Sequence, residues 1–219
     1  GDQFLQEAFD NDWLIDGVFV SGDFSRTSTQ QFSIRATLRP INGLRIQLEA
    51  SKNVAQNVNR YFFFDDSTGV YNFEAAPVVT GSYSQSFLSF GTTFVNDDER
   101  TFANSTFDQL RENRAIISQR LSARNVNSLD SLGEFGDGYG ASSQEVLLYS
   151  FLSAYGDQDP NTIGISDFTR MLPLPNWNVT YDGLSKIPFF KKYFRTVTLN
   201  HRYRSTFSVG SYTRNQNFD

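Results

Sequence analysis

31-QFSIRATLRPINGLRIQLEAS-51 shows the clearest periodicity in the chain. Apolar and polar residues alternate from Phe32 to Arg39, and they alternate again from Leu44 to Ser51. Strict alternation over this length is typical of a β-strand whose two faces meet different surroundings. The intervening Pro40-Ile41-Asn42-Gly43 is rich in residues that favour a chain reversal. This stretch therefore predicts an antiparallel hairpin.

Side-chain parity sets the register expected for this hairpin. For the apolar residues to share one face, the connection must contain an odd number of residues or a bulge. We expect Leu38 to oppose Leu44. Arg35 would then face Gln47 and lie diagonal to Glu49, which forms a polar ladder on the other face.

Further strands are predicted where shorter alternating or aromatic runs occur, which gives roughly eight strands in all. The corresponding ranges are 13–24, 58–64, 82–95, 176–181, 196–203 and 207–212. Two other ranges have apolar residues at helical spacing, 105–123 and 142–155. Ser105 with Asp108 and Ser142 with Glu145 suit helix starts, and Gly156 suits a helix end.

The chain is therefore expected to contain strands and hairpins over 1–100, a helical and loop insertion over 101–172, and strands again over 173–219. The fold class expected is mainly β, with antiparallel strands and an α-helical insertion of about two helices. Roughly eight strands could close a small barrel. The long insertion and the uneven strand quality indicate instead a portion of a larger barrel, because an open sheet edge cannot lie in lipid.

Composition excludes several classes of protein. The 219 residues include no cysteine and one histidine, so neither a disulfide framework nor a thiolate or histidine-rich metal site is expected. The formal net charge of −5 argues against a nucleic-acid partner. The sequence contains no run of about 20 apolar residues and its first residues do not resemble a signal peptide. A transmembrane β-barrel stays open, because its alternating strands cancel in an averaged hydropathy.

Four motifs could suggest chemistry, but simpler structural roles are favoured for each. The glycine-rich run 136–140 follows a helix and lacks the spacing of a dinucleotide loop. Asp157, Asp159 and Asn161 match the first positions of a calcium loop, but Thr162 and Phe168 stand where glycine and glutamate are needed.

The acidic runs 65–66 and 97–99 lie beside turn residues, and His201 shares a strand face with apolar residues. We expect solvated turns and a packed or interfacial histidine there. The sequence therefore predicts no enzyme, no cofactor and no metal site; weak calcium binding at Asp157, Asp159 and Asn161 stays open.

Aromatic residues carry more information, with 22 Phe, 10 Tyr and 2 Trp in the chain. The runs 61–64 and 189–194 combine rings with polar or charged neighbours at expected strand ends. Membrane barrels place aromatic girdles and lysines at the two interfaces. A soluble β-sandwich with an aromatic core would have a similar composition, so the residues alone leave both readings open.

The segment 172-LPLPNWNVTYDGLSKIPFF-190 resembles the C-terminal part of the SprA/Sov family, the giant outer-membrane translocon of the type IX secretion system. Other stretches similar to that family occur in the same order along the chain. They are 11-NDWL, 38-LRP with 44-LRI, 77-PVVTGSYS, 113-NRAIISQRL, and 138-GYG with 144-QEVL. The resemblance spans nearly the whole chain but only a small part of a full family member.

The resemblance implies a segment of one very large, multi-pass β-barrel in the outer membrane, through which folded cargo proteins are exported. It also implies an association with gliding motility and the cell surface. The partners implied are the rest of the barrel, a lateral-gate barrel protein, a periplasmic plug protein, a prolyl-isomerase-like accessory protein, the secreted cargo and outer-membrane lipid. The family provides no catalytic residues to transfer to this chain.

Under this interpretation the two hairpin faces acquire different roles. The residues expected to face lipid are Phe32, Ile34, Ala36, Leu38, Leu44, Ile46, Leu48 and Ala50. Those expected to line an aqueous lumen are Ser33, Arg35, Thr37, Arg45, Gln47 and Glu49. The helices would cap the pore mouth or fold into it.

Two other functions are compatible with the same patterns. A TonB-dependent or other outer-membrane uptake barrel would have similar strands, but an energy-coupling box and a plug domain are not seen in this sequence. A soluble, β-rich binding module is the alternative from a different class.

Overall fold

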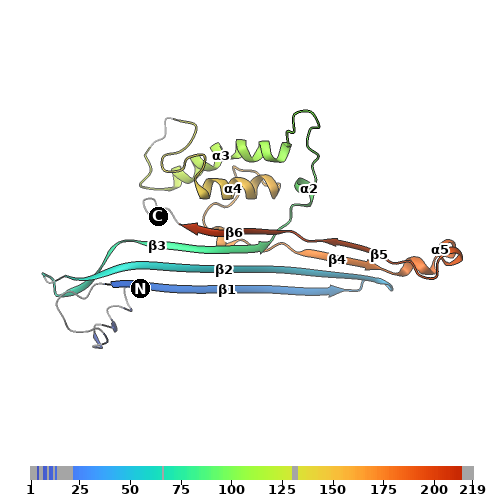
Figure 1. The fold of residues 1–219 in the computed structure, drawn as a ribbon, viewed down its shortest axis with the longest axis horizontal. Helices are drawn as coiled ribbons and strands as arrows, with labels where there is room; N and C mark the ends of the chain where they lie inside the picture. Colours follow the sequence, from blue (N-terminus) through green and yellow to red (C-terminus); the bar gives the residue numbers. More distant parts are fainter. Residues whose placement is uncertain are drawn as a thin grey trace.

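The computed structural model describes residues 22–65, 67–129 and 133–213, together with Phe4, Glu7, Ala8, Asp10, Asn11 and Trp13. Most of the strand expected over 13–24 lies outside the described residues. The described chain forms one long antiparallel sheet and a group of helices beside it (Figure 1). The broad expectation of a mainly β chain with antiparallel strands and a helical insertion is confirmed. The described sheet is open rather than closed into a barrel.

Six strands form the sheet in the described residues, and every pair of neighbours is antiparallel. They are β1 (Gly22–Leu38), β2 (Leu44–Asp65), β3 (Val70–Ser86), β4 (Asn176–Tyr181), β5 (Leu199–Tyr203) and β6 (Thr206–Thr213). β2 is the longest at 22 residues. At about 3.3 Å per residue it extends for about 70 Å. The separately predicted strand over 58–64 is thus the second half of β2.

Two strands that are far apart in sequence lie end to end along the same edge of β2, the edge away from β1. β3 pairs with residues 52–65 of β2, and β4 pairs with Leu44–Glu49 on the same side of β2. β6 pairs with the outer edge of β3, and β5 pairs with the outer edge of β4. The chain therefore leaves the sheet after Ser86 and re-enters the same row at Asn176. The residues between these two points form the helical segment, which we define as 87–175.

The hairpin has the expected parity but a different register. Leu38 pairs with Ile46 rather than with Leu44, and Arg35 pairs directly with Glu49. The connection still contains an odd number of residues, so the apolar side chains share one face. The prediction was wrong by two residues: seven residues, 39–45, separate the last pair, so Leu44 lies beyond the end of the β1–β2 ladder and pairs with Tyr181 on the other side of β2.

Two backbone hydrogen bonds hold the turn between β1 and β2: one lies within the turn, and the other comes from Asp182, just after β4. The amide of Leu44 donates to the carbonyl of Ile41 at 3.1 Å, and the amide of Asp182 donates to the carbonyl of Gly43 at 2.9 Å. Gly43 has a φ of 89°, a conformation that favours glycine. Its missing side chain also leaves room for the carboxylate of Asp182. These contacts fix the position at which β2 begins.

The helices are α2 (Phe90–Thr93), α3 (Ser105–Arg124), α4 (Gln144–Tyr155) and α5 (Pro188–Tyr193), with 3-10 turns η1 (Phe168–Arg170) and η2 (Gly183–Lys186). The two long predicted helices are confirmed as α3 and α4. Asn104 rather than Ser105 caps α3, because its side chain accepts the Phe107 amide at 3.0 Å. The strand predicted over 82–95 is wrong beyond Ser86, where the chain turns away into α2. The aromatic run 189–194, expected at a strand end, is largely helical.

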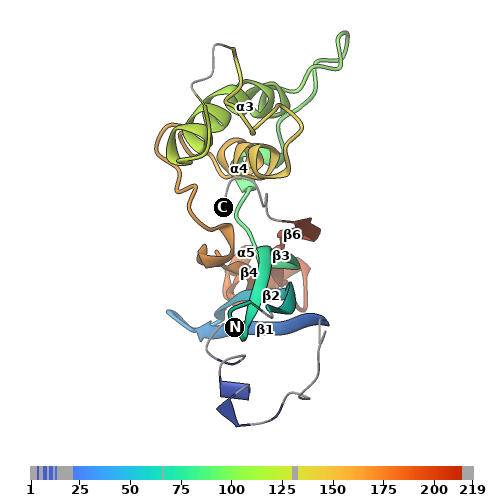
Figure 2. The ribbon, with the colours of Figure 1, turned by 90° about the vertical axis from the view of Figure 1, so that its left-hand side faces the viewer.

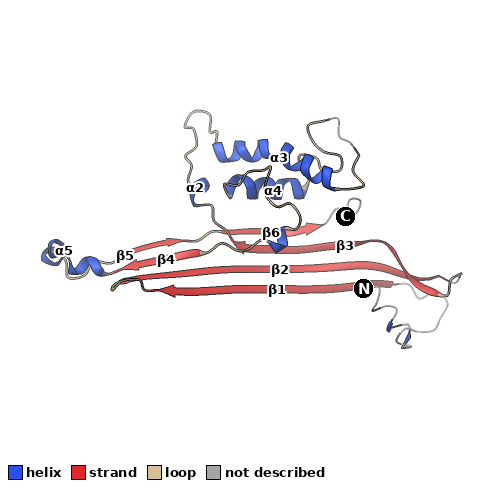
Figure 3. Ribbon diagram, turned by 180° about the vertical axis from the view of Figure 1, so that it is seen from behind, coloured by secondary structure: helices blue, strands red, loops and turns tan. Residues whose placement is uncertain are grey.

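The core of the molecule joins the helical segment to the β3 and β6 part of the sheet. Viewed along the strands, α3 and α4 lie beyond β6, and β1 lies at the opposite side (Figure 2). The view from behind shows the same arrangement, with the β4, β5 and α5 end of the sheet extending past the helices (Figure 3). The fully buried side chains Ile117, Val146 and Leu152 lie between α3 and α4. The sheet is thus covered over part of its length.

Candidate functional site

The strand registers divide the sheet into two chemically different faces. Side chains paired across neighbouring strands share a face, and alternate residues along one strand take opposite faces. We call one of them the apolar face; at the β4 and β5 end it contains Phe32, Ile34, Ala36, Leu38, Leu44, Ile46, Leu48, Ala50, Trp177, Val179, Tyr181, Leu199, His201 and Tyr203. We call the other the polar face; there it contains Ser33, Arg35, Thr37, Arg45, Gln47, Glu49, Asn176, Asn178, Thr180, Asn200 and Arg202. The hairpin residues predicted to share an apolar face do so, and those predicted to share a polar face lie on the other.

The helical segment covers the apolar face over β3 and β6. Phe168 packs edge to face on Tyr83 with ring centroids 5.4 Å apart, and on Tyr212 at 5.1 Å. Phe151 of α4 stacks on Phe207 of β6 at 5.2 Å. The helices thus lie on the face opposite to the one expected to line a lumen; whether they cap a pore mouth stays a prediction. On this face β3 and β6 present Tyr83, Phe207 and Tyr212, and the helices bury these aromatic side chains.

The remaining end of the apolar face is exposed in the described structure. Ile34 is 53 % exposed, Leu38 is 49 % and Leu199 is 56 %. Phe90 of α2 contacts Tyr203, Trp177 and His201, with ring centroids 5.6, 6.0 and 6.5 Å away. On β1 the exposed apolar stretch runs over 32–38, which is about 23 Å of extended chain. A patch of large apolar side chains on this scale marks a surface that binds another apolar phase or protein.

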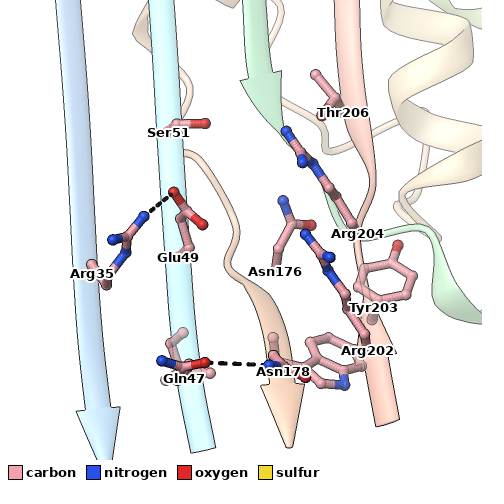
Figure 4. Close-up of a pocket in the computed structure, with 12 residues that line it drawn as sticks. Arg35, Gln47, Glu49, Ser51, Asn176, Asn178, Arg202, Tyr203, Arg204 and Thr206 are labelled. Atoms are coloured by element: carbon pink, nitrogen blue, oxygen red, sulfur yellow. Dashed lines mark hydrogen bonds and ion pairs between the residues drawn. The ribbon is translucent and has the colours of Figure 1, made fainter. Parts of the chain in front are cut away.

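A groove of about 360 Å³ lies on the polar face where the row of β3 and β4 is interrupted (Figure 4). Arg35 and Glu49 form an ion pair along one side of it at 3.0 Å, and both side chains are more than half exposed. The side chain of Asn178 donates to Gln47 at 3.2 Å. The groove is also lined by Arg202 and Arg204. It is open, hydrophilic and weakly basic.

Sequence reasoning assigned Arg35, Gln47 and Glu49 to a polar surface but missed the groove. The alternation over 196–203 places Arg202 on the polar side of its strand, so the sequence did indicate that Arg202 lies on the polar face. The groove depends on the interrupted row, which brings Asn176 next to Glu49. No local pattern shows that residues 127 positions apart are paired.

Polar side chains hold the chain where the helical segment leaves and rejoins the sheet. The hydroxyl of Ser86 accepts the Ser51 amide at 3.1 Å, and the Ser86 carbonyl accepts the Leu174 amide at 3.1 Å. The side chain of Asn176 accepts the Ser205 amide at 2.8 Å. These bonds replace the regular ladder at the break, so buried backbone groups there keep partners.

The buried hydroxyl of Tyr203 belongs to this junction and gives a test of it. It accepts the Ser89 amide at 2.8 Å. Tyr203→Phe is therefore expected to lower the free energy of unfolding by about 1–3 kcal/mol, because the buried amide loses its acceptor. Tyr83→Phe is the matched control: in the part of the chain that the structure describes, the buried Tyr83 hydroxyl has no hydrogen-bond partner. Urea denaturation should show a loss for the first variant and little change for the second; equal losses would contradict the assigned role of Tyr203.

The acidic candidates lie in turns and accept local hydrogen bonds. The Asp98 carboxylate accepts the Thr101 amide at 2.7 Å, and the pKa of Asp98 is lowered mainly by this bond. The pKa of Asp65 is lowered mainly by the Ser67 hydroxyl, which donates at 2.6 Å. The Asn161 amide donates to Asp159 at 2.9 Å and lowers its pKa. Within the described ranges no group of three or more acidic or histidine side chains is placed to hold a metal ion.

His201 and the glycine-rich loop also have packing contacts. The Nδ1 atom of His201 accepts the Trp177 indole N–H at 3.2 Å, and the two rings stack. Gly136 is buried beside Ser118 and Ser122, with no space for a side chain. Tyr139, in the same loop, belongs to the core. The loop is therefore packed against α3. This close packing accounts for the glycine at position 136, so a phosphate-binding role is not needed to explain it.

Comparisons with known proteins give no family assignment. Neither the known protein-family models nor the curated proteins include a match to this chain. Among the described residues, no helix combines the length and the apolarity needed to cross a membrane. The candidate site is thus defined by its own geometry: an exposed apolar face, a polar face behind it, and a helical segment at one end.

Proposed function

We propose that the β1, β2, β4 and β5 end of the sheet is part of the wall of a transmembrane β-barrel. We further propose that this barrel is the protein-conducting channel of type IX secretion, which exports folded cargo across the outer membrane. The first proposal is supported by the two-faced, partly uncovered sheet. The second is supported by the resemblance of 172–190 and the shorter stretches to the SprA/Sov family.

The observation that carries the proposal is the match between the exposed apolar face and a bilayer. The apolar band on the outside of such barrels is about 25 Å tall. The uncovered stretch of β1 is about 23 Å long before any tilt is considered. Its side chains are aliphatic or aromatic, while the same strands present amides, hydroxyls and charges on the other face. This alternation is what separates lipid from water in a barrel wall.

Two further features support a larger assembly. The described sheet has two open edges: one is β1, and the other is formed by β5 and β6. Hydrocarbon tolerates no open sheet edge, so additional strands would pair with both of them. We propose that the rest of the barrel provides those strands.

The lengths of the connections indicate an orientation. Outer-membrane barrels have short turns on the periplasmic side and longer loops outside. Here the short turn at Pro40–Gly43 and the connection 182–198, which contains α5, lie at the uncovered end of the sheet (Figure 1), and the much longer helical segment packs toward the other end. The strands extend well beyond the exposed apolar stretch at the other end, where the helical segment packs. We therefore propose that the uncovered end borders the periplasm and that the helical segment lies on the outer side.

The polar face would then line the aqueous interior, with the groove and its arginines exposed to passing cargo. Its charges are of both signs and its donors and acceptors are largely solvated, which suits passage without tight binding. A lateral-gate barrel, a periplasmic plug protein and a prolyl-isomerase-like accessory protein are proposed as partners on the basis of the resemblance alone. Neither a cofactor nor catalysis is part of the proposal.

Single-cysteine labelling tests the wall directly, because the chain has no cysteine of its own. Cysteines placed one at a time over 44–50 should alternate in their reaction with a membrane-impermeant maleimide. Positions 45, 47 and 49 should react from the aqueous side, and positions 44, 46, 48 and 50 should resist until the membrane is dissolved in detergent. Uniform labelling of both sets in an intact membrane, or a dispersed monomer in plain buffer, would exclude the barrel wall and favour the soluble binding module.

A further inference from the structure

The connection between β4 and β5 carries a cluster of basic and aromatic residues that the wall proposal does not use. We define it as the tip, 186-KIPFFKKYFR-195. Its basic residues are Lys186, Lys191, Lys192 and Arg195, and it contains no acidic residue. In the described structure none of these four side chains forms an ion pair. The tip is therefore a concentrated, uncompensated positive charge on a chain whose net charge is −5.

The aromatic side chains of the tip are exposed beside these charges. Phe189 is 65 % exposed, Tyr193 is 63 % and Phe194 is 53 %. Their rings contact each other rather than the sheet, with Phe189 and Tyr193 centroids 5.6 Å apart. Lys192 lies 5.4 Å from the centroid of the Tyr193 ring. The tip thus presents hydrocarbon and cationic groups side by side. A hydrophilic partner in solution would contact the cations but would not require the exposed rings.

The base of the tip is held in place. The hydroxyl of Ser185 accepts the Val197 amide at 2.8 Å and donates to the Val197 carbonyl at 3.1 Å. Gly183 packs under the Tyr181 ring, where a side chain would collide. The tip therefore projects from the end of β4 and β5, directly beyond the exposed apolar face (Figure 1).

We propose that the tip binds the headgroups of anionic phospholipids, such as phosphatidylglycerol, with its aromatic rings at the boundary of the hydrocarbon. This rests on the proposed barrel wall, which sets the bilayer against the apolar face and the tip at its periplasmic boundary. Basic residues at a membrane surface attract anionic lipids, and aromatic rings anchor at the same level. The side-by-side placement of rings and cations selects a lipid surface over an acidic peptide.

The test uses the protein reconstituted in bilayers, with a fluorophore on a single cysteine at Thr196, beside the tip. Brominated phosphatidylglycerol should quench this label more strongly than brominated phosphatidylcholine at equal mole fraction. The preference should fall about fivefold for each lysine replaced in Lys191→Gln and Lys192→Gln, and about 30-fold in the double variant. Arg100→Gln with Arg111→Gln removes the same charge from exposed positions in the helical segment and should leave the preference unchanged.

A second label separates this inference from the proposed function. A fluorophore on a cysteine at Leu48 should be quenched equally by both brominated lipids if the apolar face lies in the bilayer. Quenching at Leu48 with no lipid preference at Thr196 would overturn the inference and leave the barrel wall standing. Absence of quenching at both labels would overturn both.

Discussion

Ile46→Arg is expected to destabilise membrane assembly by about 2–4 kcal/mol, the cost of an arginine on the lipid side near the centre of a bilayer. Ile46 lies on the apolar face, paired with Leu38 of β1 and Val179 of β4. All three belong to the end of the sheet that the helices leave uncovered. The expected result is a strong loss of folded, protease-resistant protein from the membrane fraction.

The matched control is Thr37→Arg, at nearly the same depth on the opposite face. Thr37 is exposed and pairs with Gln47, the residue next to Ile46. An arginine there would face water, so its effect should stay within about 0.5 kcal/mol. Normal assembly of Ile46→Arg, or an equal loss in both variants, would show that the apolar face does not contact lipid.

Leu152→Ala is expected to cost about 2–5 kcal/mol in the stability of the helical segment. Leu152 lies on α4, is 1 % exposed and belongs to the core shared with β3 and β6. Removing most of its side chain leaves a cavity that the packed aromatic neighbours can fill only in part. Amide hydrogen exchange in α3 and α4 should accelerate strongly in this variant.

Leu147→Ala provides the comparison within the same helix. Leu147 is 38 % exposed, so the same truncation there should cost less than about 1 kcal/mol. Exchange in the first residues of β1 should stay the same in both variants, because these residues have no part in the helical core. Similar protection of α3 and α4 in the two variants would mean that the helices do not depend on the buried core described above.

Strand and helix patterns could be predicted well where a segment meets two different environments along its length. The alternation of 32–38 and 44–50, and the helical spacing of Ile117 and Leu121, both report such a boundary. The two faces of the hairpin followed from parity alone, even though its register was two residues off. Parity cannot distinguish connections whose lengths differ by two residues, so it left this shift undetermined.

The helical end of the sheet was harder to predict for the same reason. The run 82–95 keeps an apolar alternation after Ser86, but the chain leaves the ladder there: Phe87 packs on Phe151 of α4, and Phe90 packs on Trp177 and Tyr203. The tip was read as a strand end, although Pro188 followed by Phe and Lys residues suits a short helix start. Its exposed charge could be seen in the sequence; its position beyond the apolar face could not.

The unbroken course of β2 has a mechanical consequence. It is paired with β1 without interruption from Ile46 to Phe62, and the register shift in its pairing with β3 lies near its far end, between Asn59 and Tyr61. The uncovered end of the sheet and the part that carries the helices therefore share one continuous ladder. We expect these two parts to move together as one body, so that a tilt of the helical segment would also tilt the turn at Gly43.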